Sequence, residues 1–405
     1  MYQYHTLPNG IRIIFRQNNS VVTHTGVYIN VGSRDEQPGD EGMAHFIEHS
    51  VFKGTEHRRA YHILNRIDGV GGELNAFTTK EETCIYTSSL SKHLDRCLEL
   101  LADIIFHSTF PEKEIEKEKD VVLEELNSYK DTPAELIYDD FEELIFGDHP
   151  LAHNILGTKR NVKHFTTERL HKFFHTNYTT DKMVISVVGN ADFKSVVRLC
   201  ERYFSLQDHQ PSVSYRDRAP EYVHFNRAVS RHTHQMHVMV GCKAPSIYDE
   251  RKVAFSLLNN IIGGPAMNSR LNVAIREKYG FCYTVESQYS PFSDAGLFCI
   301  YAGIDTDSKE RFLDLVHREL KQLGVDKLSS TRLSAAKQQY IGQMAINNEL
   351  ALNEMQSIGK AYLSYDHVDT LEEMQRDIES VTADEICSLA QELFSLDNLS
   401  YLFYC

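Results

Sequence analysis

Two histidines and a glutamate lie close together in the run His45-Phe46-Ile47-Glu48-His49. His45 and His49 are four residues apart, so on a helix their side chains lie one turn apart on one face. Two imidazoles placed in this way can bind a single Zn²⁺ at about 2.0–2.1 Å. Glu48 flanks them in the pattern His-x-x-Glu-His, where a carboxylate can take a proton from metal-held water. The run predicts a metal site on a helix over 41–53, and the alternative is a surface helix with two solvated histidines.

A catalytic zinc ion needs a third protein ligand and one open position for water. Pro111 is tolerated in a first helical turn and begins a predicted helix that ends near residue 130. This helix carries Glu118, Glu124 and Glu125, of which the first and last are seven residues apart and share a face. We predict Glu125 as the third ligand, and Glu118 as a hydrogen-bond partner of a ligand histidine's outer nitrogen. Glu124 is the alternative ligand, and a charged helix that only faces solvent is the competing interpretation.

Two further segments carry groups that a hydrolytic site can use. Asn75-Ala76-Phe77 precedes a predicted strand over 83–88 and could pair with a peptide backbone as an added strand. Arg276 and Tyr283 could both donate to a carbonyl oxygen that becomes an oxyanion. Each segment also has an ordinary interpretation, namely a polar loop, a surface arginine and a half-buried tyrosine.

Length and composition are typical of a globular protein with two domains: 405 residues, 42% hydrophobic and 24% charged. The formal net charge of −15 argues against a nucleic-acid partner, because phosphate binding requires basic surface. No apolar run could span a bilayer and no secretory signal is visible, so we predict no membrane association and a cytoplasmic location. The eight cysteines include no Cys-x-x-Cys pair and are expected to be free thiols.

The predicted elements follow the same order in the two halves of the chain. Those of the first half cover 11–15, 23–31, 41–53, 83–88, 90–105 and 111–130. Those of the second half cover 223–225, 234–240, 251–262, 297–303, 309–323 and 330–348. The helix over 251–262 takes the place of the histidine helix and has no histidine. We therefore predict domains at 1–207 and 222–405, a linker at 208–221 and a metal in the first domain only, with chance similarity as the alternative.

Over essentially its whole length, the sequence resembles the pitrilysin, insulysin and mitochondrial processing peptidase family. The residues that carry the resemblance are Val31-Gly32-Ser33-Arg34-Asp35-Glu36, Gly42-Met43-Ala44-His45-Phe46-Ile47-Glu48-His49, Asn75-Ala76-Phe77-Thr78, Val121-Val122-Leu123-Glu124-Glu125, Gly263-Gly264, Ser269-Arg270-Leu271, Arg276 and Tyr283. The resemblance implies an α+β fold of two homologous domains that pair into a clamshell chamber. Each domain would be a mixed, mostly antiparallel β-sheet covered by helices on one side.

The resemblance also implies a site and an activity. It implies one Zn²⁺ per chain held by His45, His49 and Glu125, with Glu48 as general base and Glu118 as a supporting carboxylate. The implied activity is that of a zinc metalloendopeptidase, which hydrolyses extended peptides or unfolded segments enclosed in the chamber.

The resemblance further implies that Asn75, Ala76 and Phe77 lie along the substrate, and that Arg276 and Tyr283 act from the second domain. Because one chain carries both the zinc motif and the Arg/Tyr pair, a homodimer or a self-sufficient chain is favoured, and an enzyme that works only with an unlike partner subunit is an alternative. A non-enzymatic assembly subunit is the alternative function. Such relatives typically have damaged motifs, whereas this sequence keeps every element.

Overall fold

The structure, a computed structural model, describes residues 1–205, 207–208, 211, 216–231 and 233–405. These residues form two compact units. Unit 1 comprises 1–127, 153–216 and 346–370, and unit 2 comprises 128–152, 217–345 and 371–405. Much of the predicted linker, 209–210 and 212–215, lies outside the described residues.

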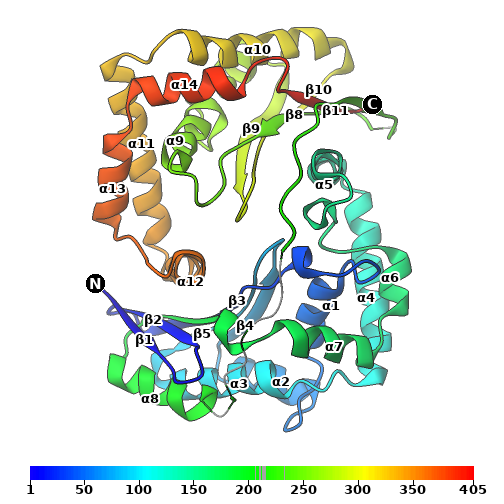
Figure 1. The fold of residues 1–405 in the computed structure, drawn as a ribbon, viewed down its shortest axis with the longest axis vertical. Coiled ribbons are helices and arrows are strands. Elements are labelled where there is room, and N and C mark those ends of the chain that lie inside the picture. Colours follow the sequence, from blue (N-terminus) through cyan, green and yellow to red (C-terminus); the bar gives the residue numbers. More distant parts are fainter. Residues whose placement is uncertain (206, 209–210, 212–215, 232) are drawn as a thin grey trace. The chain divides into compact units, whose positions relative to one another are not determined.

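Unit 1 is built on a mixed six-stranded sheet in the order β1-β2-β6-β3-β5-β4 (Figure 1). Its strands are β1 (Tyr2–Thr6), β2 (Arg12–Gln17), β3 (Val22–Ile29), β4 (Glu73–Thr78), β5 (Thr83–Leu90) and β6 (Met183–Gly189). Strands β2 and β6 are parallel, and all other neighbours are antiparallel. Strand β4 lies at one edge, so one side of its backbone has no strand partner among the described residues.

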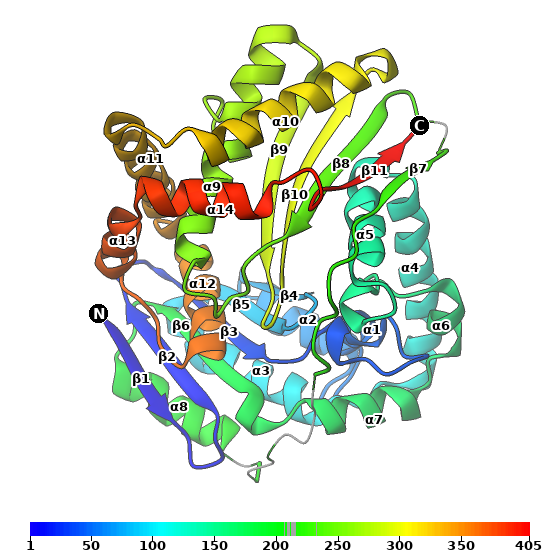
Figure 2. The same cartoon turned by 45° about the horizontal axis from the view of Figure 1, so that its top comes forward.

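One face of this sheet packs against most of the helices of unit 1 and forms a core with Ile13, Phe15, Val27 and Ile185. The helices of the unit are α1 (Met43–Ser50), α2 (Ala60–Asp68), α3 (Leu94–His107), α4 (Glu112–Lys130), α6 (Lys159–His164), α7 (Thr167–Asn177), α8 (Phe193–Phe204) and α12 (Ala351–Tyr365). Alternation along the strands turns other side chains to the second face, where α12 packs against them (Figure 2). The helix that covers this second face therefore comes from the later half of the chain.

Unit 2 is built on a five-stranded sheet in the order β7-β11-β8-β10-β9. Its strands are β7 (Asn226–Val229), β8 (Met236–Lys243), β9 (Cys282–Pro291), β10 (Gly296–Ile304) and β11 (Ser400–Tyr404). Its helices are α5 (Pro133–Phe146), α9 (Lys252–Gly263), the π-helix η5 (Asn272–Glu277), α10 (Lys309–Val325), α11 (Ser330–Asn348), α13 (Leu371–Ser380) and α14 (Ala383–Leu393). Only β7 and β11 are parallel neighbours. Helix α5, from the earlier half of the chain, packs on the face of this sheet opposite to the other helices.

The sheet of unit 2 repeats five strands of unit 1 in order and direction. Strands β7 to β11 correspond in chain order to β2 to β6, because both sets are arranged as first, fifth, second, fourth and third, with only the first and fifth parallel. Helices α1 and α9 each lie between the second and third strands of the repeat, and α4 and α11 between the fourth and fifth. Helices α5 and α12 also correspond, and each packs on the sheet formed by the other half of the chain.

Most predicted elements differ from the structure by a few residues at their ends, and two of them differ more clearly. The histidine helix α1 is shorter than the predicted 41–53 because its last turn is followed by an irregular turn over 51–53. The predicted strand over 223–225 is wrong, since β7 begins at Asn226. Phe225 instead lies just before the strand and holds the chain against β11. Its backbone N–H donates to the side chain of Ser400, and its carbonyl oxygen accepts from the backbone N–H of Tyr401.

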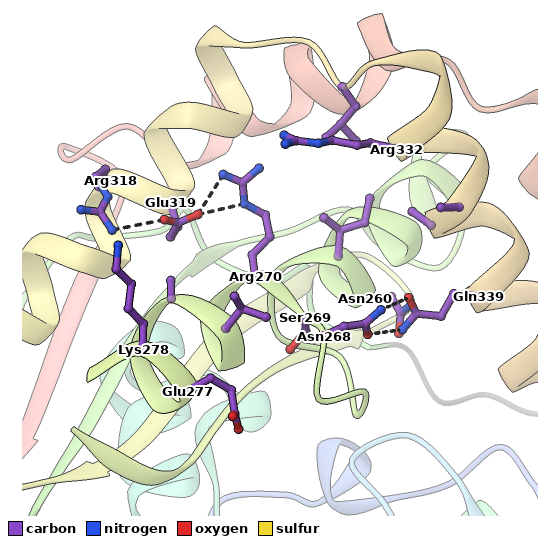
Figure 3. Close-up of a pocket in the computed structure, with 16 residues that line it drawn as sticks. Asn260, Asn268, Ser269, Arg270, Glu277, Lys278, Arg318, Glu319, Arg332 and Gln339 are labelled. Atoms are coloured by element: carbon purple, nitrogen blue, oxygen red, sulfur yellow. Dashed lines mark hydrogen bonds and ion pairs between the residues drawn. The ribbon is translucent and has the colours of Figure 1, made fainter. Parts of the chain in front are cut away.

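The prediction of an α+β fold with two mixed, mostly antiparallel sheets is confirmed, and each sheet has one helix, α12 or α5, on the face opposite to its main helical layer. No helix in the described part of the chain is both long and apolar enough to cross a membrane. Unit 2 contains a cavity of about 830 Å³ among α9, η5, α10 and α11 (Figure 3).

Candidate zinc site

A buried carboxylate binds the backbone N–H groups at the start of helix α1. Its N-cap residue, Gly42, has a φ of +96°, which a residue with a side chain rarely adopts. The backbone N–H groups of Gly42 and Ala44 donate to the two carboxylate oxygens of Glu36 at 3.0 and 2.8 Å. Burial raises the pKa of Glu36, while these two donors favour its charged form. Glu36 thus satisfies donors that a helix start leaves without intrahelical partners.

Apolar packing fixes which face of α1 enters the core. Met43, Phe46 and Ile47 are completely buried in the main core of unit 1. The other face carries His45, which is 7% exposed, and the half-buried Glu48 and His49. The three residues of the motif are therefore held by a helix that cannot rotate without exposing its core side chains.

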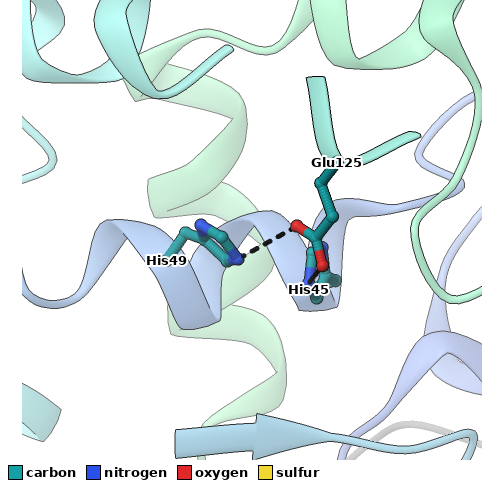
Figure 4. A group of neighbouring side chains, drawn as sticks. All are labelled: His45, His49 and Glu125. Atoms are coloured by element: carbon teal, nitrogen blue, oxygen red, sulfur yellow. Dashed lines mark ion pairs between the residues drawn. The ribbon is translucent and has the colours of Figure 1, made fainter. Parts of the chain in front are cut away.

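His45, His49 and Glu125 converge in unit 1 (Figure 4). The Nε2 atom of His45 lies 3.8 Å from Oε1 of Glu125, and Nε2 of His49 lies 3.6 Å from Oε2. Two ligands bound at about 2.0–2.1 Å to one tetrahedral ion are about 3.3 Å apart. One potential ligand atom from each residue falls within 4.8 Å of the others. The donor set, two imidazoles and a carboxylate, is one that zinc binds in catalytic sites, so these residues fit the ion.

His45 is held in its neutral form. Burial, and after it the neighbouring His49, lower the pKa of His45 to about 3. Neutral imidazole is the form that binds a metal. The Nδ1 atom of His45 is buried and makes no hydrogen bond within the described residues.

Glu118 orients His49 from the opposite side of the ring. The Nδ1 atom of His49 lies 2.9 Å from Oε1 of Glu118, and Nζ of Lys53 lies 2.6 Å from Oε2 of the same carboxylate. Burial opposes charge on Glu118, but the hydrogen bonds from His49 and Lys53 outweigh it and lower the pKa of the carboxyl. Burial likewise opposes charge on His49, but the hydrogen bond to Glu118 and the charges of the neighbouring carboxylates together outweigh it and raise the pKa of that ring. This contact leaves Nε2 of His49 directed toward Glu125.

Glu48 lies among the same groups and is electrostatically coupled to His49 and Glu125. Burial raises its pKa, and hydrogen bonds from the side chain and backbone of Thr78 act in the opposite direction. Thr78 is the last residue of the edge strand β4. The carboxylate is therefore held between the histidine helix and the end of this strand.

Asn75, Ala76 and Phe77 lie on β4, which is a strand and not a polar loop. The backbone N–H of Ala76 donates to the side chain of Asn75 at 2.9 Å in an exposed position, so it does not pair with β5. The ring of Phe77 packs on the other face of the sheet against Tyr28 and Tyr86. Ala76 thus presents its backbone toward the open edge of the sheet.

Arg276 and Tyr283 lie together in unit 2. The guanidinium carbon of Arg276 is 5.5 Å from the ring centroid of Tyr283, which is 86% exposed. Arg276 is on the π-helix η5, a type of helix that is often found at functional sites. Their predicted action on substrate stays a prediction.

Glu124 differs from its two neighbours on α4. It is exposed, and in the described part of the chain it does not belong to the group that could hold a metal. Glu118 and Glu125 share a face of α4 as their spacing predicts, but they approach different atoms of His49. The assignments of Glu125 as ligand and Glu118 as its support stay predictions, and this geometry favours both.

Sequence reasoning gave no role to Glu36, Lys53 and Thr78, although Glu36 and Thr78 lie in segments that carry the family resemblance. Lys53 follows His49 by four residues, so helical spacing could have drawn attention to it. Thr78 belongs to the Asn75 segment, but nothing in its spacing indicates a contact with Glu48. Glu36 lies in an irregular segment before α1, and no periodicity connects it to Gly42 and Ala44.

Comparison with known proteins assigns the family. Residues 12–159 match the family model described as Insulinase (Peptidase family M16), and residues 164–340 match the one described as Peptidase M16 inactive domain. An uncharacterized zinc protease of Bacillus subtilis, YmxG, is 34% identical over 398 residues, covering 98% of this chain and 97% of the relative. An uncharacterized zinc protease of Rickettsia bellii is 32% identical and covers 93% of each chain.

Solved structures show the same fold. A protease from Helicobacter pylori has a TM-score of 0.93 at 22% identity and covers 100% of this chain and 99% of its own. A peptidase M16 inactive domain from Pseudomonas fluorescens has a TM-score of 0.92 at 20% identity, with 100% and 97% covered. The chain belongs to the insulinase family, peptidase family M16, and the prediction of a metallopeptidase of this family is confirmed.

Proposed function

We propose that this chain binds one zinc ion through His45, His49 and Glu125 and uses Glu48 as general base to hydrolyse peptide bonds. The convergence of the two Nε2 atoms on the carboxylate of Glu125 carries this proposal. The relatives named zinc proteases support zinc over other divalent ions that nitrogen and oxygen ligands also bind.

A zinc ion held by His45, His49 and Glu125 would act as a Lewis acid and would lower the pKa of a water molecule toward about 7. Glu48 takes a proton from the attacking water and delivers it to the leaving amine. The two hydrogen bonds from Thr78 orient this carboxylate, and Glu118 with Lys53 orients the ring of His49. The residues of the chain therefore position the base and the ligands before substrate arrives.

The substrate is an extended peptide. Strand β4 is at the edge of its sheet, and the N–H of Ala76 is available there once the side chain of Asn75 gives way. An extended backbone can pair with such an edge as an added strand, which places it next to Thr78 and Glu48. Because only unpaired, extended chain can pair in this way, unfolded segments are preferred over folded proteins. Enclosure of the substrate in a chamber is proposed from the family resemblance.

Tyr283 and Arg276 are proposed to donate to the oxyanion that forms during attack. Tyr283 is largely exposed and its hydroxyl is free to reach a ligand, while the guanidinium of Arg276 lies over its ring. Removing one oxyanion donor typically costs about 3 kcal/mol of transition-state stabilisation. A Tyr283→Phe variant should lose kcat and keep its zinc.

A homodimer is likewise proposed, and sedimentation of the purified chain tests it.

Zinc content and peptide cleavage, measured together, test the main proposal. Glu48→Gln should keep about one zinc per chain and lose about 10²–10⁴-fold in kcat. Glu125→Gln should lose the metal, whereas Glu124→Gln, its matched control one position away, should retain it. Loss of zinc from Glu48→Gln would make Glu48 a ligand and overturn its role as base. Loss from Glu124→Gln alone would overturn the choice of third ligand.

A further inference from the structure

We infer that the cavity of unit 2 binds a phosphorylated small molecule that carries at least two negative charges. The cavity has a volume of about 830 Å³, within the range of about 300–1,000 Å³ that ligand pockets occupy. None of the proposed zinc residues lines it. The inference therefore does not depend on the proposed peptidase mechanism.

Cationic side chains outnumber carboxylates around this cavity. Its charged lining residues are Arg270, Lys278, Arg318, Arg332, Glu277 and Glu319, a local excess of two positive charges. The chain as a whole has a formal net charge of −15, so the sign is reversed here. In Figure 3, Arg270, Arg318 and Lys278 extend toward Glu319, and Arg332 extends from α11 over the same cavity. Because like charges repel at short range, this arrangement favours an anion among them.

Glu319 neutralises only part of this charge. Its Oε2 accepts from Nε and Nη2 of Arg270 at 3.0 and 2.8 Å, and its Oε1 lies 3.5 Å from Nη2 of Arg318. The side chain of Glu277 is 57% exposed and lies 4.0 Å from Arg276, which does not line the cavity. One carboxylate thus lies between two guanidinium groups.

Arg332 and Lys278 supply the charge that a ligand can use. Across the described residues, Arg332 donates from its backbone N–H to Ser329, and its guanidinium makes no hydrogen bond or ion pair. Lys278 lies over the ring of Tyr279 at 5.3 Å and forms no ion pair in the same part of the chain. Both side chains are exposed, so a phosphate group can approach them without displacing an existing ion partner. Guanidinium and ammonium groups are the usual phosphate-binding side chains.

The remaining lining suits the body of such a ligand. The apolar lining residues are Ile261, Val273, Ala274, Leu328, Ala335 and Ala336. The side-chain amides of Asn268 and Gln339 bond to each other at 3.2 and 3.0 Å. A ligand with an anionic end and an apolar or aromatic body therefore matches the cavity better than a free phosphate ion does.

The position of the cavity in the repeated fold supports a binding role. In unit 1 the proposed zinc residues lie on α1 and α4, and in unit 2 the helices in the same places are α9 and α11. Asn260 of α9 and Arg332 and Gln339 of α11 line the cavity, and no histidine does. Two corresponding pairs of helices thus carry the proposed cation ligands in one unit and the proposed anion-binding residues in the other.

Calorimetric titration of the full chain with ADP, tripolyphosphate and inorganic phosphate tests this inference. ADP should bind more tightly than inorganic phosphate, and salt should weaken its binding. Arg332→Gln and Lys278→Gln should each weaken ADP binding by about 10-fold, since each removes a charge-assisted contact. Arg227→Gln changes an exposed arginine of β7 outside the cavity and should leave binding unchanged.

Several results would overturn the inference. The first is no binding of any probe at millimolar concentration. The second is an equal effect of Arg227→Gln and Arg332→Gln. The third is that an acidic peptide binds to the cavity and ADP does not, which would assign the cavity to peptides. Because phosphates also bind metals, the His49→Ala variant serves as a control and should bind ADP as the unaltered chain does. Loss of ADP binding in that variant would move the signal to the zinc site.

Discussion

Glu118 and His49 form a hydrogen bond of 2.9 Å between Oε1 and Nδ1, and this bond decides which nitrogen of the ring faces Glu125. The second carboxylate oxygen of Glu118 is held by Lys53 at 2.6 Å. The carboxylate is thus fixed at both oxygens and in turn fixes the ring. A metal site built in this way depends on a residue that does not touch the metal.

Glu118→Gln should weaken zinc binding by about 10–100-fold without removing a ligand. The neutral amide orients the His49 ring less firmly than the carboxylate does and makes the ring less basic. Competition with a fluorescent chelator measures this affinity. Glu116→Gln is the matched control, since Glu116 lies on the same helix, is 62% exposed and pairs with Lys119 away from the site. If Glu118→Gln binds zinc with the affinity of the unaltered chain, Glu118 does not support the site.

Glu36→Ala should destabilise the chain by about 1–3 kcal/mol and reduce its zinc affinity, because the buried N–H groups of Gly42 and Ala44 lose their acceptor. Glu36→Gln keeps one acceptor oxygen and should recover part of both losses. Urea unfolding and zinc titration measure them. Glu41→Gln, which alters a carboxylate that accepts from the exposed Gly39 N–H, should have a smaller effect on both. Unchanged zinc affinity in Glu36→Ala would show that the cap does not position α1.

Ala76→Pro should raise KM and lower kcat/KM for long peptides, because proline removes the N–H that faces the open edge of β4. Zinc content should remain at the level of the unaltered chain. Asn75→Ala keeps that N–H and should retain most of the activity, so the pair separates backbone pairing from the side chain. Full activity of Ala76→Pro would exclude strand addition at this edge.

Asp103→Asn should destabilise the chain by about 2 kcal/mol at neutral pH. The carboxylate of Asp103 is buried on α3 and accepts from Thr55, His57 and Arg58 at 2.9, 2.6 and 2.6 Å, which fastens the turn after α1. Burial opposes its ionisation, but these hydrogen bonds outweigh burial and lower its pKa.

A lowered carboxyl pKa contributes stability that is present above the unfolded value of about 3.9 and is lost as the pH falls through the folded value. The difference in the free energy of unfolding between Asp103→Asn and the unaltered chain should therefore become smaller as the pH is lowered from 7 to 3. Urea unfolding across this range measures it, with the exposed Asp68→Asn as control. An equal difference at both ends would mean that packing, not charge, is responsible.

Local features of the site were predictable from the sequence. The four-residue spacing of His45 and His49 defines one helical face, and α1 presents both on that face. The seven-residue spacing of Glu118 and Glu125 likewise defines a face of α4. Part of the order of strands and helices in the two halves was also predictable, because periodicity and turn residues act over short stretches of chain.

The sequence by itself determined which residues share a helical face, since this follows from 3.6 residues per turn. Only the tertiary structure decided that Glu125, and not Glu124, approaches the two histidines, that Glu36 caps their helix, and that α12 covers the first sheet while α5 covers the second. These contacts join segments far apart in the chain. They depend on how whole faces of helices and sheets pack to bury their apolar side chains, which no local pattern encodes.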